Sequence, residues 1–389
     1  MKIAMVGPYP LPGRPPTGGI EAVATALVAG LRAEGVEPAL VTCTGSVSRP
    51  ERVDADGLDM HLIPYGAASG SRIPYLSEHR AIGQALREIA PDVVHVQGQN
   101  HYGPACLAVG LPTVVTLHGI LYREQRIADP TASRGTRIRA RFRNGLNARF
   151  ERTTLRKARH LVIISPYVSE AVKHLTSAHM HDIANPIDED FYDIPRRPVP
   201  GRVLFVGVVG TRKNVLVLVR AFAQVLARRP DATLHLVGRP ADETYIDQVR
   251  STISELRMGD SVRYLGVVSD EELREQYAEA SLLALPSKEE SSPMAIQQAM
   301  AMGLPVVASR AGGIPFLVKD GVTGLLATPD DETDLAEQLL TALGDDDLRA
   351  RMAEACVTEA ERFRLGTVAR ATLDLYSIAA GRPVAMATA

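Results

Sequence analysis

The chain contains no tryptophan, and aromatic residues make up only 5% of its 389 residues. Proteins that bind single-stranded nucleic acid rely on aromatic side chains on which the bases stack. The formal net charge is −2, from 43 basic and 45 acidic residues, whereas nucleic-acid-binding domains are usually basic. The composition therefore argues against a nucleic acid as a partner.

Cysteine is also scarce. Cys43, Cys106 and Cys356 are an odd number and lie far apart in the sequence, which is not the pattern of a disulfide framework or of a metal site. No apolar run is long enough to span a bilayer, and the run at residues 2–6 is too short for the apolar core of a signal peptide. We therefore expect a cytoplasmic protein that binds no metal.

Short apolar runs alternate with longer stretches of helical periodicity along the whole chain. The runs are rich in valine, isoleucine and leucine without regular polar alternation, which is typical of parallel strands covered on both faces. Strands that alternate with helices in this way predict doubly wound α/β domains. The predicted strands are residues 2–6, 39–43, 61–64, 92–96, 113–117, 160–165, 202–206, 233–237, 262–265, 282–285 and 305–308.

A chain of this length favours two domains. Prolines at positions 186, 195, 198 and 200 interrupt the periodicity near the middle, which indicates an interdomain linker. Ligands of such sheets bind beyond the carboxyl ends of the strands, so we expect the loops of the two domains to line a central cleft. The predicted parts are a first domain (1–184), a linker (185–200), a second domain (201–366), and a C-terminal helix and tail (367–389) that pack back on the first domain.

Two predicted loops have residues suited to phosphate. Gly18 and Gly19 precede a helical pattern, where glycine lets backbone N–H groups approach an anion, although an ordinary flexible loop would look the same. Arg212 and Lys213 follow the strand at 202–206. Cations there can stabilise the charge that develops on a diphosphate leaving group, and a solvated pair at a turn is the alternative.

The strongest signal is the segment 287–313. Ser292 is a suitable N-cap and Pro293 a suitable first residue of a helix, so Glu290 would stand just before a helix N-terminus. The N–H groups there can bind a phosphate or a sugar hydroxyl, and Glu290 can accept hydrogen bonds from hydroxyls. Gln298, two turns further on, could reach a ribose. A capping carboxylate and a surface amide are the structural alternatives.

His118 ends the strand predicted at 113–117, where it could hydrogen-bond a reacting sugar, although a histidine at a strand end is more often structural. Residues 134–159 are rich in arginine, with Glu151 as the single acid. They predict a basic amphipathic helix or helix pair, which either packs on the first domain or makes weak peripheral contact with an anionic membrane. We favour packing. Its apolar stripe is Ile138, Phe142, Leu146 and Phe150.

Taken together, these segments resemble the retaining GT-B glycosyltransferases of family 4, also called group 1. The resemblance covers nearly the whole chain. It implies two Rossmann-like domains and transfer of a sugar from a nucleotide diphosphate-sugar, with a UDP-sugar favoured, to an acceptor hydroxyl. It also implies retention of anomeric configuration without a metal or other cofactor. The matching features are Gly18-Gly19-Ile20-Glu21, His118-Gly119, Asn185-Pro186-Ile187-Asp188, Lys213 after Phe-Val-Gly, and Pro286-Ser287 through Gly312-Gly313.

The resemblance also implies roles for individual residues. Lys213 would bind the diphosphate, Glu290 the donor-sugar hydroxyls and Gln298 the ribose, while His118 would lie near the reacting part of the sugar. Further donor contacts are expected from Gly18, Gly19, Gly207, Gly238, Arg239, Val267, Ser291, Ser292, Pro293 and Met294. Acceptor contacts are expected from Gln97, Asn100, His101 and Tyr122.

The chain departs from the family pattern at three positions. Val208 stands where many members have arginine, and we hypothesise that Arg212 supplies the missing charge. Gln298 and Phe316 stand where glutamates are usual. Two alternatives therefore stay open: a degenerate relative that binds a nucleotide sugar or a partner without turnover, and a sugar-nucleotide epimerase. An epimerase would need further carboxylates for elimination chemistry, and the sequence shows no such set.

Overall fold

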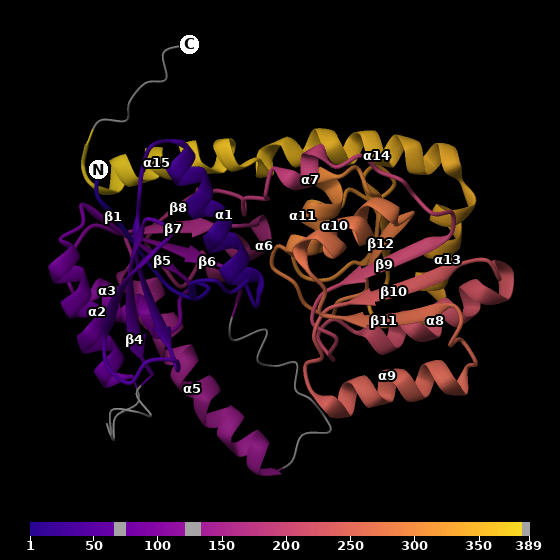
Figure 1. The fold of residues 1–389 in the computed structure, drawn as a ribbon, viewed down its shortest axis with the longest axis horizontal. Coiled ribbons are helices and arrows are strands. Elements are labelled where there is room, and N and C mark those ends of the chain that lie inside the picture. Colours follow the sequence, from indigo (N-terminus) through magenta and orange to yellow (C-terminus); the bar gives the residue numbers. More distant parts are fainter. Residues whose placement is uncertain (66–74, 121–133, 383–389) are drawn as a thin grey trace. The chain divides into compact units, whose positions relative to one another are not determined.

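The structure, a computed structural model, describes residues 1–65, 75–120 and 134–382. The chain forms two compact units (Figure 1). The first contains Met1–Pro186 and Leu365–Ala389, and the second contains Ile187–Arg364. Each unit has a sheet of mainly parallel strands with helices on both faces, which confirms the predicted pair of Rossmann-like domains.

The sheet of the first unit has the strand order β3-β4-β2-β1-β5-β6-β7-β8. Among the strand pairs of this sheet that the structure describes, only β3–β4 is antiparallel. The order runs outward in opposite directions from β1 and β5, so the switch point lies between these two strands. Its strands are β1 (Ile3–Val6), β2 (Ala39–Thr44), β3 (Glu51–Ala55), β4 (Leu58–Pro64), β5 (Val93–Gln97), β6 (Thr113–Leu117), β7 (His160–Ile163) and β8 (His179–Asp182).

Successive residues of β1 point to opposite faces of this sheet and enter two separate cores. Ala4 and Val6 pack with α2 (Leu76–Ile89), α3 (Tyr102–Leu107) and α6 (Pro166–Val172). Ile3 and Met5 pack with α1 (Gly19–Ala33) and with α15 (Leu365–Ala379). Because both faces of β1 are buried, its sequence is an unbroken apolar run without polar alternation.

The C-terminal helix α15 lies beside α1 in the first unit (Figure 1). A Cβ on Gly30 of α1 would come within 3.1 Å of Ala369, so the two helices approach closely at that point. Arg370 on α15 also pairs with Glu34, with 3.0 Å between Nη1 and Oε1. The last helix in the sequence therefore contributes to the core formed by the first strands.

The sheet of the second unit is parallel throughout, with the order β11-β10-β9-β12-β13-β14. Its switch point lies between β9 and β12. The strands are β9 (Arg202–Val206), β10 (Thr233–Val237), β11 (Val262–Gly266), β12 (Leu282–Leu285), β13 (Val306–Ser309) and β14 (Gly324–Ala327). The helices are α7 (Asp190–Asp193), α8 (Val215–Arg228), α9 (Glu243–Glu255), α10 (Asp270–Glu279), α11 (Met294–Ala301), α12 (Ile314–Leu317), α13 (Glu332–Gly344) and α14 (Asp346–Ala360), followed by a 3₁₀ turn at Glu361–Phe363.

The residues predicted as a linker pack against the second unit. The backbone N–H groups of Arg197 and Val199 donate to the carbonyls of Ala278 and Glu279, at 2.9 and 2.8 Å. Phe191 of α7 is buried edge-on against Tyr277, with 5.6 Å between ring centroids. The proline-rich stretch is thus bound to one unit along part of its length.

The arginine-rich stretch forms one continuous helix, α5 (Arg134–Lys157), in the first unit. Phe150, the last member of its predicted apolar stripe, lies edge-on to Tyr75 with 5.4 Å between ring centroids. At this end, therefore, the stripe packs on the helix's own domain. Within the described residues, no helix has the length and apolar character required to span a membrane.

Candidate functional site

The loops that follow β9 and β12 meet at the switch point of the second unit. Lys213 and Arg212 lie on the loop between β9 and α8, and Glu290 lies on the loop between β12 and α11. The backbone N–H of Lys288 donates to the carbonyl of Arg212 at 2.9 Å and joins the two loops directly. The structure thus brings Glu290 together with two adjacent cations that precede it by about 77 residues in the sequence.

These three side chains form a charge cluster around one carboxylate oxygen. Lys213 Nζ lies 2.6 Å from Glu290 Oε1, and Arg212 Nη1 lies 3.1 Å from the same oxygen. Burial disfavours ionisation of Glu290, but the charges of Lys213 and Arg212 outweigh it and lower the pKa of this carboxyl below its ordinary value. The carboxylate is therefore ionised at neutral pH, and the cluster carries a net charge of about +1.

Two glycines make room for this cluster. Gly207 has a φ of +151°, and a Cβ there would stand 3.2 Å from Cε of Lys213. Gly312 has a φ of +52°, and a Cβ there would come within 2.2 Å of the carbonyl oxygen of Glu290. The next residue, Gly313, donates its N–H to the same carbonyl at 2.6 Å. The Gly-Gly pair therefore holds the backbone of Glu290 in place.

A second polar network supports the same loops, and it was not predicted from the sequence. Asp330, which follows β14, accepts from Asn214 Nδ2 at 2.9 Å and pairs with Lys288 Nζ at 2.6 Å. Asn214 and Asp330 both have positive φ, 59° and 61°. Lys288 lies within the predicted segment 287–313, but no local signal points to Asp330, because its contact depends on the packing of β14 beside β13.

The helix after Glu290 begins later than predicted. α11 starts at Met294 and Pro293 is its N-cap, with no side-chain cap hydrogen bond. The prediction that Ser292 caps this helix is therefore wrong. Its hydroxyl instead accepts from Gln297 Nε2 at 2.8 Å, a partner one turn into the helix that sequence reasoning could not anticipate. Ser291 is buried as well, and among the described residues its hydroxyl has no hydrogen-bond partner.

Gln298 lies on α11 and is only partly buried. Its Oε1 accepts from the hydroxyl of Tyr277 at 3.0 Å. Tyr277 is fully buried on α10, and its single hydroxyl hydrogen is shared with the carbonyl of Ala295, at 3.2 Å. The Gln298 side chain is thus oriented by a tyrosine that sequence reasoning did not identify.

The other predicted donor residues of the second unit occupy neighbouring strand ends. Gly238 follows β10, and a Cβ there would come within 2.0 Å of the carbonyl oxygen of Gly207. Arg239 is exposed, and Val267, just after β11, is 75% exposed. Pro293 is buried and Met294 partly buried at the start of α11. These positions lie along the carboxyl edge of one sheet, as predicted.

The predicted residues of the first unit also lie at the carboxyl ends of strands. Gly18 and Gly19 begin α1, both are exposed, and a Cβ at either would meet open space. His118 follows β6 and is partly buried. Its Nε2 lies 2.7 Å from Oε1 of Gln97 at the end of β5. Burial lowers the pKa of His118 to about 4, so its imidazole is neutral at pH 7.

The residues predicted to contact an acceptor have different environments. Gln97 is only 1% exposed and its amide oxygen faces His118, so direct contact with an acceptor does not fit its position. Asn100 is partly buried and accepts from the backbone N–H of Tyr102. His101 is 7% exposed and stacks on Tyr75 at 4.7 Å. Tyr122 lies outside the described residues.

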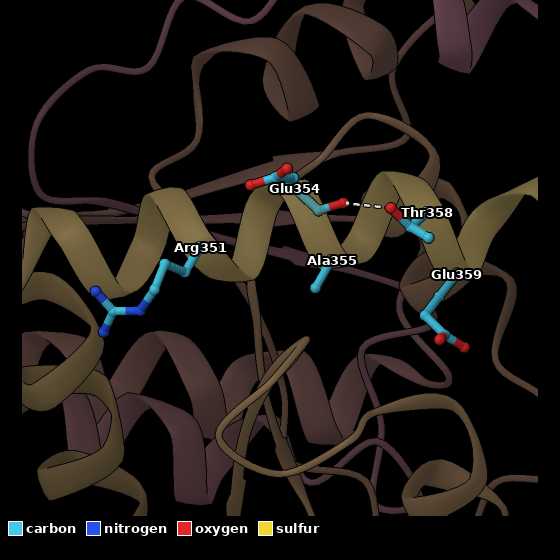
Figure 2. Close-up of a pocket in the computed structure, with 5 residues that line it drawn as sticks. All are labelled: Arg351, Glu354, Ala355, Thr358 and Glu359. Atoms are coloured by element: carbon cyan, nitrogen blue, oxygen red, sulfur yellow. Dashed lines mark hydrogen bonds between the residues drawn. The ribbon is translucent and has the colours of Figure 1, made fainter.

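A pocket on the second unit is lined by none of these residues. It is formed on α14 by Arg351, Glu354, Ala355, Thr358 and Glu359 (Figure 2). The Thr358 hydroxyl donates to the carbonyl of Glu354 within the helix, so it is engaged locally. In the part of the chain that the structure describes, no group of three or more His, Cys, Asp or Glu side chains could hold a metal ion.

Two family models match the chain, one in each half. The model of the glycosyl transferases group 1 matches residues 187–356. The model of Glycosyltransferase Family 4 matches residues 17–191. Together they cover the chain from the glycine pair before α1 to α14.

The chain is also similar to curated proteins over part of its length. It is 37% identical over 182 residues to the D-inositol 3-phosphate glycosyltransferase of Corynebacterium efficiens, and 36% identical over 186 residues to that of a Nocardioides species. These matches cover 45% of this chain and 42% and 41% of the two relatives. The chain thus spans less than half the length of the curated relatives it matches.

Solved structures show the same fold over almost the whole chain. Sucrose-phosphate synthase from Thermosynechococcus elongatus has a TM-score of 0.81 at 21% identity, covering 97% of this chain and 98% of that one. Anabaena HepE in complex with UDP and glucose has a TM-score of 0.73 at 20% identity, covering 97% and 100%. The solved structures show that the fold is GT-B, and the two family models, which between them match residues 17–356, show that the chain belongs to the group 1 glycosyltransferases.

Proposed function

We propose that this protein transfers a sugar from a nucleotide diphosphate-sugar to an acceptor hydroxyl, with retention of anomeric configuration and without a metal. The observation that carries the proposal is the convergence of Lys213 and Arg212 on Glu290 at the switch point of the second unit. In open α/β sheets the ligand binds at this point. Cations placed there in advance can stabilise the negative charge of a leaving diphosphate.

The charges of the cluster suit the two parts of such a donor. Lys213 is only 11% exposed, so its ammonium group interacts with an anion with little screening by water. Glu290 can accept hydrogen bonds from sugar hydroxyls, and the fork of Arg212 matches phosphate oxygens. A UDP-sugar is our first choice of donor, because HepE, a neighbour in fold, is described in complex with UDP-glucose.

The proposed step breaks the bond between the anomeric carbon and the diphosphate oxygen and forms a bond from the same carbon to the acceptor oxygen. Both events take place on one face of the sugar, which retains its configuration. The acceptor proton passes to an oxygen of the departing diphosphate. Lys213 and Arg212 would stabilise that diphosphate in place of a metal ion, and His118 would bind a hydroxyl of the donor sugar.

We propose only the chemical class of the acceptor. The curated relatives are named for D-inositol 3-phosphate, so cyclitols and their phosphates are the first acceptors to test.

Peripheral membrane contact through α5 stays a separate hypothesis. Sedimentation with anionic vesicles at low salt would test it, and a protein that stays in the supernatant would remove it.

Turnover of a panel of nucleotide sugars tests the proposal. We expect thermal stabilisation by one of UDP, GDP, dTDP and ADP, release of that diphosphate from the matching sugar donor in excess EDTA, and a product with the donor's anomeric configuration by NMR. A degenerate relative would show stabilisation without release. An epimerase would convert the donor sugar to its isomer while the nucleotide stays attached.

A further inference from the structure

His118 is the first member of a hydrogen-bonded chain that ends on the C-terminal helix. Gln97 Oε1 lies 2.7 Å from His118 Nε2, and Gln97 Nε2 lies 3.4 Å from His95 Nε2. His95 Nδ1 in turn lies 2.7 Å from the hydroxyl of Tyr376 on α15. Gln97, His95 and Tyr376 are 1%, 1% and 0% exposed. This series of hydrogen bonds therefore crosses the interior of the first unit between its sheet and α15.

The chemistry of the groups decides which atom donates in each of these hydrogen bonds. An amide oxygen can only accept, so the hydrogen between Gln97 and His118 is carried by His118 Nε2. The amide nitrogen of Gln97 donates, so His95 Nε2 accepts, and the hydroxyl of Thr116, 2.7 Å away, donates to the same nitrogen. The hydrogen of His95 is then on Nδ1 and is donated to Tyr376.

We propose that Gln97, His95 and Tyr376 are positioning residues that hold His118 in its Nε2–H tautomer, so that Nδ1 is a hydrogen-bond acceptor for a hydroxyl of the donor sugar. The sugar contact rests on the proposed function, whereas the tautomer does not. A nitrogen that can only accept pairs with a hydroxyl and not with a phosphate oxygen. The Nε2–H tautomer thus suits His118 to the contact with the donor sugar that the family resemblance implies.

Burial keeps all titratable members of the chain uncharged at neutral pH. Burial lowers the pKa of His95 to about 3 and that of His118 to about 4. Burial raises the pKa of the Tyr376 hydroxyl far above its ordinary value. A neutral imidazole has one donor and one acceptor nitrogen, so its tautomer depends on the groups around it. Replacing one of these residues leaves the buried polar group of its neighbour without a hydrogen-bond partner. The neighbour is then no longer held in one orientation or tautomer.

The tautomer of His118 can be measured by NMR on the full-length protein labelled with ¹⁵N-histidine, with the His118 signals assigned by their loss in His118→Asn. We expect wild type to show the Nε2–H form. Gln97→Met should give a mixture of tautomers. Gln97→Glu should keep the Nε2–H form and raise the pKa of His118 by at least one unit, because a carboxylate favours the imidazolium. An Nδ1–H form in wild type, or an unchanged tautomer in Gln97→Met, would overturn the proposal.

Kinetics test the far end of the chain with a matched pair on α15. Tyr376→Phe removes the hydroxyl that bonds His95 and should lower kcat at least fivefold, with the KM for the donor changed less than twofold. Thr372→Val removes an equally buried hydroxyl whose hydrogen bond, among the described residues, is to the carbonyl of Val368 within α15, and it should leave kcat unchanged. Equal kcat in the two variants, at equal melting temperature, counts against positioning. If wild type transfers no sugar, the proposed function fails, and the NMR result still decides the tautomer.

Discussion

Lys213 and Glu290 form a buried ion pair, with 2.6 Å between Nζ and Oε1 and side chains only 11% and 6% exposed. Arg212 Nη1 lies 3.1 Å from the same oxygen, and the Arg212 side chain is 40% exposed. In the structure described here the carboxylate is the counter-ion of both cations. A bound diphosphate would compete with Glu290 for these cations and release the carboxylate to the hydroxyls of the sugar.

Replacing Glu290 with glutamine should separate nucleotide binding from turnover. UDP carries no sugar, so its affinity for Glu290→Gln should equal or exceed that of wild type, because the cations lose their internal counter-ion. Sugar transfer should fall by about 100-fold, the loss typical of removing one group that stabilises a transition state. Titration calorimetry with UDP and a turnover assay measure the two effects. As a control, Glu289→Gln removes the same charge one residue away and should retain turnover. Much weaker UDP binding by Glu290→Gln would contradict the idea that the diphosphate replaces Glu290 as the partner of the two cations.

Arg212→Ala tests whether this residue supplies the charge that Val208 lacks. The guanidinium lies 3.1 Å from both Glu290 Oε1 and the carbonyl of Glu289, where it can reach a diphosphate on the same loop. We expect kcat/KM for the donor to fall by about 100-fold or more. Arg228→Ala, which removes an exposed arginine at the other end of α8, should change it less than twofold. Near-normal turnover of Arg212→Ala would contradict the hypothesis that Arg212 supplies the positive charge missing at Val208.

The stability of the second unit should depend on pH through Glu290. Its folded-state pKa is held below the ordinary value by Lys213 and Arg212, against the effect of burial. Ionisation therefore contributes stability that is fully present above about pH 4.5 and is lost as the pH falls through the folded-state pKa. Urea unfolding at pH 7, 5 and 4 should show Glu290→Gln approaching wild type as the pH falls. A difference in free energy of unfolding that stays constant with pH would show that the charge of Glu290 does not stabilise the fold.

Gly312 and Gly321 offer a matched test of the Glu290 loop. Both have positive φ, +52° and +75°, but a Cβ would stand 2.2 Å from the Glu290 carbonyl oxygen at Gly312 and would meet nothing within 4 Å at Gly321. Gly321→Ala should cost about 1–2 kcal/mol of unfolding free energy from backbone strain alone. Gly312→Ala should cost a further 1–3 kcal/mol for the steric overlap and should also lower turnover. Equal losses in the two variants would show that contact with Glu290 is unimportant.

Every predicted strand coincides with an observed strand to within about three residues at each end, and the strands that the prediction omitted, β3, β8 and β14, lie at sheet edges. Residues 202–206 and 282–285 are apolar runs, and they form β9 and β12 with the predicted bounds. β3 and β8 are edge strands with exposed polar residues, and β14 is a four-residue edge strand. An edge strand gains stability from pairing with one neighbour, and this long-range contact leaves little trace in the local pattern.

The sequence by itself determined which segments carry the candidate chemistry. Lys213 and Glu290 could be identified because strands buried on both faces are continuous apolar runs, so the polar residues that follow them stand out. Gly207 could be identified for a similar reason, since a glycine directly after a strand indicates unusual backbone geometry, whereas Gly312 was indicated only by the family resemblance.

Only the tertiary structure decided how these residues are paired. That Lys213 and Arg212 share one oxygen of Glu290, that Asp330 holds the loop of Asn214, and that Tyr376 reaches His118 through His95 and Gln97 all depend on contacts between distant segments. Local periodicity reports the burial of a residue but not its partner, because strand order and helix packing select the partner after the segments have formed.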